Sequence, residues 1–158
     1  MTGLPIYRTR IAPEWIDYNG HLRDAYYGLI ASLAVDSLMD RIGLDARYRQ
    51  ESRCTLYTVE MHLHFLREIG ASDSVEVMAR ILGADEKRIH AALELVRENG
   101  GETAATCEMM LLHVRQSAPP RTTAFPREVA AAIAELRRTS AAMPASGPGS
   151  RRMELPNR

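Results

Sequence analysis

The stretch PEWIDYNGHLRDAYYGLI, residues 13–30, places one carboxylate, Asp17, in a polar loop directly before an apolar segment. A carboxylate in such a loop can act as a nucleophile, or as a general base that delivers water to a carbonyl carbon. The unpaired N–H groups and the positive dipole end of a following helix suit the negative charge that then develops on the carbonyl oxygen. The residues DYNG are also common turn formers, and from this segment alone an ordinary turn is the favoured interpretation.

Three neighbours of Asp17 are candidates to shape that chemistry. Gly20 has no side chain, so it would let a substrate approach the backbone closely. Asn19 and His21 are candidates to orient the water or the reacting carbonyl group, by side chain or by backbone. These residues extend the candidate catalytic group along the loop.

Aromatic side chains are concentrated near the same loop in the order of the chain. The candidates are Trp15, Tyr18, Tyr26, Tyr27 and Tyr57. The faces of such rings attract quaternary ammonium groups through cation–π interactions, so these residues are candidates to bind a cationic substrate group. Helix packing is the alternative for Tyr26 and Tyr27, and we expect it for at least one of them.

The residues around the loop predict the elements that would hold it. A short strand covers about residues 5–12. After the Asn19–Gly20 turn, Asp24 is a suitable N-cap for a helix that ends at Gly43. This helix carries apolar residues on more than one face, so we expect it to be central and largely enclosed.

Four strands are expected after the helix. Alternating apolar residues predict strands in TVEMHLHFL, SVEVMARIL and RIHAALELV, and the run TAATCEMMLLHV follows. Residues 83–86 and 99–101 supply hairpin turns, so the four strands should form an antiparallel meander. The obvious object for this sheet to cover is the long helix, which predicts an α+β fold with the sheet wrapped around it.

The C-terminal part predicts one short helix and a tail. Pro119 and Pro120 close the meander, and Pro126 lies near the first turn of an amphipathic helix that runs to about Arg138. Residues 139–158 are rich in small residues, Pro and Gly, so we expect a disordered tail after a single domain of residues 1–138.

The strand expected at TVEMHLHFL carries a polar row. Thr58, Glu60, His62 and His64 share one face of it, because side chains alternate with a period of two. For His62 and His64, a solvated or interface-facing surface is at least as good an interpretation as a catalytic one. The spacing is compatible in geometry with a metal site, but a catalytic zinc centre needs an open coordination position and supporting groups, and we expect no metal.

Composition narrows the class of protein. The 158 residues are 46% hydrophobic, which is enough for one core, and 20 basic residues balance 20 acidic ones, so binding to nucleic acid or to an anionic membrane is not expected. We see no secretory signal and no apolar run long enough to span a bilayer. Cys54 and Cys107 lack metal-type spacing and are expected to be reduced thiols, which favours a cytoplasmic protein.

Several of these segments together resemble a known family. PEWIDYNGHLRDAYY is similar to the Asp-x-x-Gly-His segment before the central helix of hot-dog-fold acyl-CoA thioesterases, and the resemblance continues through YTVEMHLHFLREI, ADEKRIH and ETAATCEMMLLHV. It covers roughly residues 7–138. Within that superfamily the chain looks most like the betainyl-CoA thioesterases of carnitine breakdown, which are related to the 4-hydroxybenzoyl-CoA thioesterase type. The whole pattern reverses the preference for an ordinary turn at Asp17.

The resemblance implies roles for particular residues. Asp17 would act as general base or as nucleophile on an acyl-CoA thioester, and backbone N–H groups from Gly20 to the helix start would polarise the carbonyl. Thr58 or Glu60 would enter the site, because relatives place a polar residue of this strand opposite the aspartate across a dimer interface. Coenzyme A is then part of the substrate, and no separate cofactor is expected. Its phosphates would need basic residues, and the candidates are Arg67, Lys87 and Arg88, although any exposed strand end carries such charges.

Assembly and two other functions follow from the same scaffold. A single sheet curled around one helix leaves an edge strand exposed, so we expect a homodimer or a dimer of dimers. The same fold can serve a hydratase or dehydratase, in which a His-Asp or His-Glu pair transfers protons and no thiol is released. It can also serve as a non-catalytic acyl-CoA-binding module.

Overall fold

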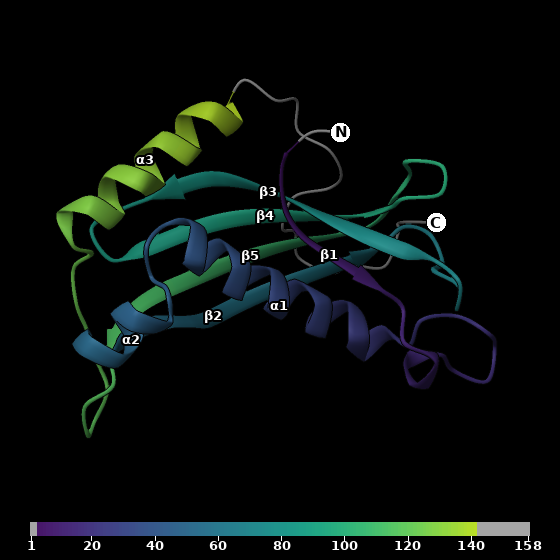
Figure 1. Cartoon of the computed structure of the whole chain (residues 1–158), viewed down its shortest axis with the longest axis horizontal. Coiled ribbons are helices and arrows are strands. Elements are labelled where there is room, and N and C mark those ends of the chain that lie inside the picture. The colour runs from purple at the N-terminus through teal and green to yellow at the C-terminus, as the bar shows by residue number, and fades with distance from the viewer. Residues whose placement is uncertain (1–2, 142–158) are drawn as a thin grey trace, which may run out of the picture.

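The computed structural model describes residues 3–141, which form one antiparallel sheet with a long helix across one face (Figure 1). Its elements are β1 (Leu4–Arg10), the 3-10 helix η1 (Pro13–Trp15), α1 (Asp24–Arg41), α2 (Ala46–Ser52), β2 (Cys54–Phe65), β3 (Ser74–Ala84), β4 (Arg88–Arg97), β5 (Thr103–Arg115), β6 (Arg121–Thr122) and α3 (Arg127–Ala141). This is the α+β hot-dog fold expected from the sequence. No helix of the described part combines the length and apolar character needed to cross a membrane.

The sheet order corrects the expected four-strand meander. The strands follow the order β1-β3-β4-β5-β2, and β6 pairs with the end of β5. Only β3, β4 and β5 form the meander, whereas β2 pairs with β5, from Cys54 opposite Arg115 to Phe65 opposite Ala105. The alternation of side chains along a strand predicts that it is a strand, but it carries no information about which neighbour the strand joins. The segment between β2 and β3 therefore crosses from the β2 edge of the sheet to β3, the strand next to the opposite edge strand β1.

The position of β2 also changes which of its side chains are buried. Much of its apolar row does not face the core, because Val59 is 54% exposed, Met61 36% and Phe65 55%. The register of β2 against β5 shifts between Thr58 and Glu60, which interrupts the strict alternation. As an edge strand, β2 is thus apolar and open to solvent in the single chain.

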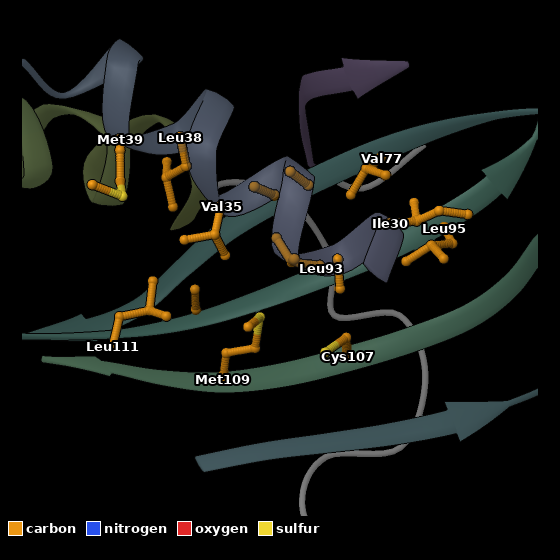
Figure 2. Packing of buried hydrophobic residues seen from close by; sticks show 14 of the residues in the cluster. Ile30, Val35, Leu38, Met39, Val77, Leu93, Leu95, Cys107, Met109 and Leu111 are labelled. Carbon is orange, nitrogen blue, oxygen red and sulfur yellow. The ribbon is translucent and has the colours of Figure 1, made fainter. Parts of the chain in front are cut away.

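The core lies between α1 and the sheet (Figure 2). Ile30 and Leu38 of α1 pack with Leu93, Leu95 and Met109 of the sheet in one buried cluster. Burying a side chain of this size contributes about 1.5–3 kcal/mol. The helix is less enclosed than expected, because Leu29 on its other flank is 40% exposed.

The ends of α1 differ in how well the sequence predicts them. Gly43 has φ +86° and follows the C-cap residue Ile42, as expected for a helix terminator. Asp24 is not the N-cap: Arg23 occupies that position without a side-chain cap, and Asp24 is the first helical residue, its Oδ1 accepting the N–H of Ala25 at 2.8 Å. An Asp next to the true cap position gives the same sequence signal as the cap itself.

Three short elements, η1, α2 and β6, were not predicted, and one helix is longer than expected. The segment ARYRQES of α2 has no apolar period, and it is started by Asp45, whose side chain accepts the N–H of Tyr48 at 2.8 Å. The strand β6 has only two residues. The helix α3 continues to Ala141, and Ser140 is buried, its Oγ accepting the N–H of Ile81 at 3.2 Å. The rest of the predicted tail, residues 142–158, lies outside the described residues.

A buried histidine joins α2, β5 and the segment before α3. The side chain of His113 is fully buried and stacks on Phe125, with ring centroids 4.8 Å apart. Its Nδ1 lies 2.9 Å from the carbonyl oxygen of Thr123, so Nδ1 carries the proton, and Nε2 accepts from the hydroxyl of Tyr48 at 3.1 Å. Burial lowers the pKa of His113, so the ring stays neutral in the folded chain.

Because burial lowers the pKa of His113, the folded chain should lose stability in mild acid. Below the usual histidine pKa of about 6.5 the unfolded chain binds a proton that folded His113 resists, so the free energy of unfolding should fall with a slope of up to about 1.4 kcal/mol per pH unit. Urea denaturation at a series of pH values from neutral to mildly acidic measures it. His113→Asn should flatten this dependence, whereas His64→Gln, at a partly exposed site, should keep it. An unchanged pH slope in His113→Asn would contradict the assignment.

Candidate active site

A cleft of about 580 Å³ opens at the N-terminal end of α1. The loop before the helix, the first turn of α1 and the segment after β2 supply its walls. The lining residues are Asp17, Tyr18, Asn19, His21, Leu22, Arg23, Asp24, Tyr27, Phe65, Leu66, Arg67 and Glu68. The cleft thus brings the loop around Asp17 together with residues that lie more than forty positions later in the chain.

The loop closes on itself through backbone hydrogen bonds. The N–H of Asp17 donates to the carbonyl oxygen of His21 at 2.9 Å, and the N–H of Gly20 donates to that of Asp17 at 3.1 Å. Gly20 has φ +83°, a conformation that favours glycine, and a Cβ added there would meet nothing within 4 Å. Glycine is therefore required here by the backbone conformation, and nothing crowds the position.

The carboxylate of Asp17 is held by the loop that carries it. Its Oδ1 accepts the backbone N–H of Asn19 at 2.8 Å and that of His21 at 3.3 Å, and the side-chain amide of Asn19 lies 3.4 Å from Oδ2. Desolvation would raise the pKa of Asp17, but these hydrogen bonds outweigh it and hold the pKa below its usual value. Asp17 is consequently an oriented carboxylate anion at neutral pH.

The start of α1 leaves one donor open beside this carboxylate. The N–H groups of Leu22, Arg23 and Ala25 already have acceptors, at 2.7, 3.0 and 2.8 Å, and the N–H of Gly20 is used in the turn. Among the hydrogen bonds between described residues, none uses the N–H of Asp24. Because Asp24 lines the cleft as the first residue of α1, its N–H is the donor that an oxyanion could reach.

The cleft contains a contact between a histidine and a carboxylate that the sequence did not predict. Nε2 of His21 lies 3.0 Å from a carboxylate oxygen of Glu68. Glu68 was not a candidate, because it follows the end of a strand with no local motif. The backbone pairing of His21 with Gly70 brings it to the cleft, and this contact is tertiary. Phe65 and Leu66 were missed for the same reason.

The aromatic candidates separate into three groups. Tyr18 and Tyr27 line the cleft, and Phe65 packs edge-on against Tyr27 with ring centroids 5.1 Å apart. Trp15 and Tyr26 stack on each other at 5.3 Å and 16°, and both pack against the core, so packing accounts for Tyr26. Tyr57 lies near the start of β2, whereas the cleft lies at the end of that strand.

The basic candidates also separate. Arg67 lines the cleft. Lys87 and Arg88 lie at the β3–β4 turn, at the other end of the sheet from the loop of Asp17 (Figure 1). Arg88 is paired with Asp85, its Nε and Nη2 lying 2.7 and 2.6 Å from Oδ2, and this guanidinium lowers the pKa of Asp85 to about 2.

The polar row of β2 does not reach the cleft of its own chain. Thr58 and Glu60 are exposed and are not among the lining residues. Glu60 instead pairs with His62, with 2.7 Å between Oε1 and Nε2. Within the described residues, no group of three or more His, Cys, Asp or Glu side chains is arranged to hold a metal ion.

Comparison with known proteins decides the family. The family model described as "Thioesterase-like superfamily" matches residues 11–133. The chain belongs to this superfamily. Betainyl-CoA thioesterase of Pseudomonas aeruginosa is 45% identical over 141 residues, which cover 89% of this chain and 88% of that protein. L-carnitine dehydrogenase/betainyl-CoA thioesterase of Agrobacterium fabrum is 39% identical over 84% of this chain, but the match covers only 27% of that longer protein.

Two solved structures share the architecture of this chain. A Staphylococcus aureus protein in complex with CoA has a TM-score of 0.86 and 29% sequence identity, with 99% of this chain and 98% of that chain covered. The 1,4-dihydroxy-2-naphthoyl-CoA thioesterase of Synechocystis has a TM-score of 0.71 at 15% identity, with 82% and 95% covered, which shows the shared fold alone.

Proposed function

We propose that this chain hydrolyses an acyl-CoA thioester and that betainyl-CoA is its substrate. One observation carries the proposal: in a member of the thioesterase-like superfamily, the same cleft is lined by Asp17, whose pKa is held below its usual value, and by Asp24, whose N–H donates to none of the described residues. The relative that is 45% identical and bears the name betainyl-CoA thioesterase supports the choice of acyl group.

The mechanism uses the two groups on opposite atoms of the thioester carbonyl. Asp17 either attacks the carbonyl carbon, forming a mixed anhydride as the thiolate of coenzyme A leaves, or removes a proton from a water molecule that attacks instead. The N–H of Asp24, at the positive end of the α1 dipole, stabilises the oxyanion. Water then completes the first route by cleaving the anhydride. Neither route requires a cofactor.

The cleft suits a cationic acyl group. Three carboxylates line it, those of Asp17, Asp24 and Glu68, and the rings of Tyr27 and Phe65 lie beside them. A trimethylammonium group is stabilised by nearby anions and by aromatic surface. The cation site proposed here is therefore made by Tyr18, Tyr27 and Phe65, and it excludes the stacked pair of Trp15 and Tyr26.

The coenzyme A part of the substrate would contact Arg67, the basic candidate that lines the cleft. Lys87 and Arg88 could serve the phosphates only from a second copy of the chain, because they lie at the far end of their own sheet. The free, buried thiols of Cys54 and Cys107 support the proposed cytoplasmic location.

We propose further that two copies pair through β2. This strand has twelve residues, lies at the edge of the sheet, and exposes Val59, Met61 and Phe65. A long, apolar edge strand is an aggregation hazard unless another strand covers it. Antiparallel pairing of two β2 strands brings the Tyr57 end of one beside the Phe65 end of the other, so that Tyr57, Thr58 and Glu60 become available to the second cleft.

A hydratase is the second candidate, and the contact of His21 with Glu68 is the observation that favours it. Such a pair can move protons to and from an enoyl thioester. Hydration leaves the thioester bond intact, so the appearance of free coenzyme A separates the two reactions.

Removing the charge of Asp17 should abolish most of the activity. Asp17→Asn keeps an oxygen acceptor for the N–H groups of Asn19 and His21 but cannot act as base or nucleophile, so kcat should fall by about 10²-fold or more. Thiol release from betainyl-CoA, followed with a thiol-reactive dye, measures it. Asp36→Asn, on the exposed side of α1, is the control and should retain activity. Wild-type turnover in Asp17→Asn would rule out the catalytic role of this residue.

The positive charge of the acyl group should determine selectivity. The 3,3-dimethylbutyryl thioester has the shape of the betainyl thioester with a neutral carbon in place of nitrogen. Since a cation beside aromatic rings gains about 1–2 kcal/mol, kcat/KM should favour the betainyl ester by roughly 5–30-fold. Glu68→Gln should reduce this ratio. Equal rates on both esters would contradict the cationic subsite while leaving thioester hydrolysis intact.

Charges placed on β2 should separate the proposed dimer. Light scattering of the wild-type chain should give twice the mass of one chain, and Met61→Lys should give a single chain with much lower activity, because the second copy no longer completes the cleft. Leu29→Lys, on α1, tests how far the interface extends. A monomeric and fully active wild-type protein would contradict the β2 pairing.

A further inference from the structure

The loop that carries Asp17 is tied at its first residue to Asp73. This loop leaves β1 at Ile11, and the N–H of Ile11 donates to the backbone carbonyl oxygen of Asp73 at 3.1 Å. Ile11 is itself buried, 3% exposed. The entry to the loop is therefore fixed both by its apolar side chain and by a hydrogen bond to the residue just before β3.

The other end of the loop is tied to the same place. The N–H of Leu22 donates to the carbonyl oxygen of Ile69 at 2.7 Å, and His21 forms a β-bridge with Gly70. The N–H of Gly70 in turn donates to Oδ2 of Asp73 at 2.8 Å. Both ends of the loop thus converge on Asp73, one through its backbone and the other through its carboxylate.

Asp73 is one of two buried acidic residues in the described part of the chain, with 7% of its surface exposed, and the other is Glu94. Its N–H donates back to the carbonyl oxygen of Gly70 at 3.2 Å, so the turn from Gly70 to Asp73 is closed by a backbone bond and by a side-chain bond. Nε of Arg97 lies 3.2 Å from Oδ2 in an ion pair, although its N–H is not aligned for a hydrogen bond. A carboxylate with so little access to water depends on such partners.

The ion pair continues toward the cleft. Nη1 of Arg97 lies 3.9 Å from one carboxylate oxygen of Glu102, and Nε of Arg67 lies 3.5 Å from the other. Arg67 lines the cleft, and its backbone N–H is held by Ala104 at 3.0 Å. Charges of alternating sign therefore connect the buried carboxylate with a wall of the cleft.

We infer that Asp73 is a positioning residue, which with Arg97 clamps both ends of the loop of residues 11–22 and so sets the place of Asp17 and of the α1 N-terminus in the cleft. The inference rests on the proposed function, because it assigns Asp73 a part in the same reaction. Asp73 is absent from the lining of the cleft and so acts only through other residues. The carboxylate of Asp17 depends on the N–H of His21, and His21 is paired with the residue that Asp73 holds.

A merely structural role for Asp73 makes a different prediction. If Asp73 only stabilised the fold, its loss would lower the stability of the whole domain, and the loop would keep its native hydrogen bonds in the molecules that remain folded. If it clamps the loop, its loss would open residues 16–23 locally, while the sheet stays protected. Backbone hydrogen exchange separates these cases without reference to activity.

The test is Asp73→Ala, which removes both the acceptor of the Gly70 N–H and the charge that pairs with Arg97. Amide exchange of Asn19, His21 and Leu22 should become at least about tenfold faster relative to the β4 amides, which report global opening. On betainyl-CoA, kcat should fall about tenfold or more with KM changed by less than about threefold, because misplacing a catalytic group lowers the rate of the chemical step. Arg97→Lys should retain more activity than Arg97→Met.

Two controls make the outcome decisive. Val129→Ala, in α3 at the other end of the molecule, lowers stability without contacting the loop, and Glu98→Gln removes the exposed ion pair with Arg8 near the same end of the sheet. Both should leave kcat and the exchange of residues 16–23 at wild-type values. Should Asp73→Ala behave like Val129→Ala, with unchanged loop exchange and kcat, the clamp is wrong. If the wild-type chain releases no thiol from any acyl-CoA, the proposed function fails, and faster loop exchange in Asp73→Ala still establishes the clamp.

Discussion

The packing of α1 against the curved sheet is the contact on which the rest of the structure depends. Ile30, Ala34 and Leu38 are fully or almost fully buried against strands of the sheet, so the helix axis is fixed by apolar contact along its length. The N-terminus of α1 therefore lies at a defined end of the sheet, where β2 ends. A helix end is a donor of N–H groups wherever it lies, and it becomes useful for chemistry only where a cleft gives it access to a substrate.

The loop before α1 places the carboxylate of Asp17 at that helix end, and several hydrogen bonds offset its repulsion with the carboxylate of Asp24. Two carboxylates that lie near each other, those of Asp17 and Asp24, would repel if they were unsupported. Asp17 is satisfied by the N–H groups of its own loop, and Asp24 by that of Ala25. The loop is in turn paired with residues Ile69 and Gly70, which Asp73 holds. The acyl-CoA chemistry proposed for the cleft thus rests on a chain of hydrogen bonds that ends at the buried side chain of Asp73, directly before β3.

Local sequence signals were sufficient for the long elements and for the loop, but not for the short elements α2 and β6 or for the contacts between elements. The helix, the strands and the turn at Gly20 follow from periodicity and from glycine conformation, and the family resemblance selected Asp17. The neighbour of β2 could not be predicted, because alternation along one strand does not name its partner in the sheet. Glu68 and Asp73 could not be found either, since each reaches the site through backbone pairing between distant segments. Trp15 and Tyr26 had the right residue types for a cation site, but their faces are used on each other.

The central claim is that Asp17 and the Asp24 N–H act on opposite atoms of one thioester carbonyl. A crystal structure with a ketone analogue of betainyl-CoA, in which a methylene group replaces the thioester sulfur, tests it most directly because the analogue keeps the carbonyl and cannot be hydrolysed. The account predicts the carbonyl oxygen within about 3.1 Å of the Asp24 nitrogen. It also predicts a carboxylate oxygen of Asp17, or a water molecule bound to it, about 3–3.5 Å from the carbonyl carbon. A carbonyl group bound elsewhere in the cleft, out of reach of both residues, would contradict the account.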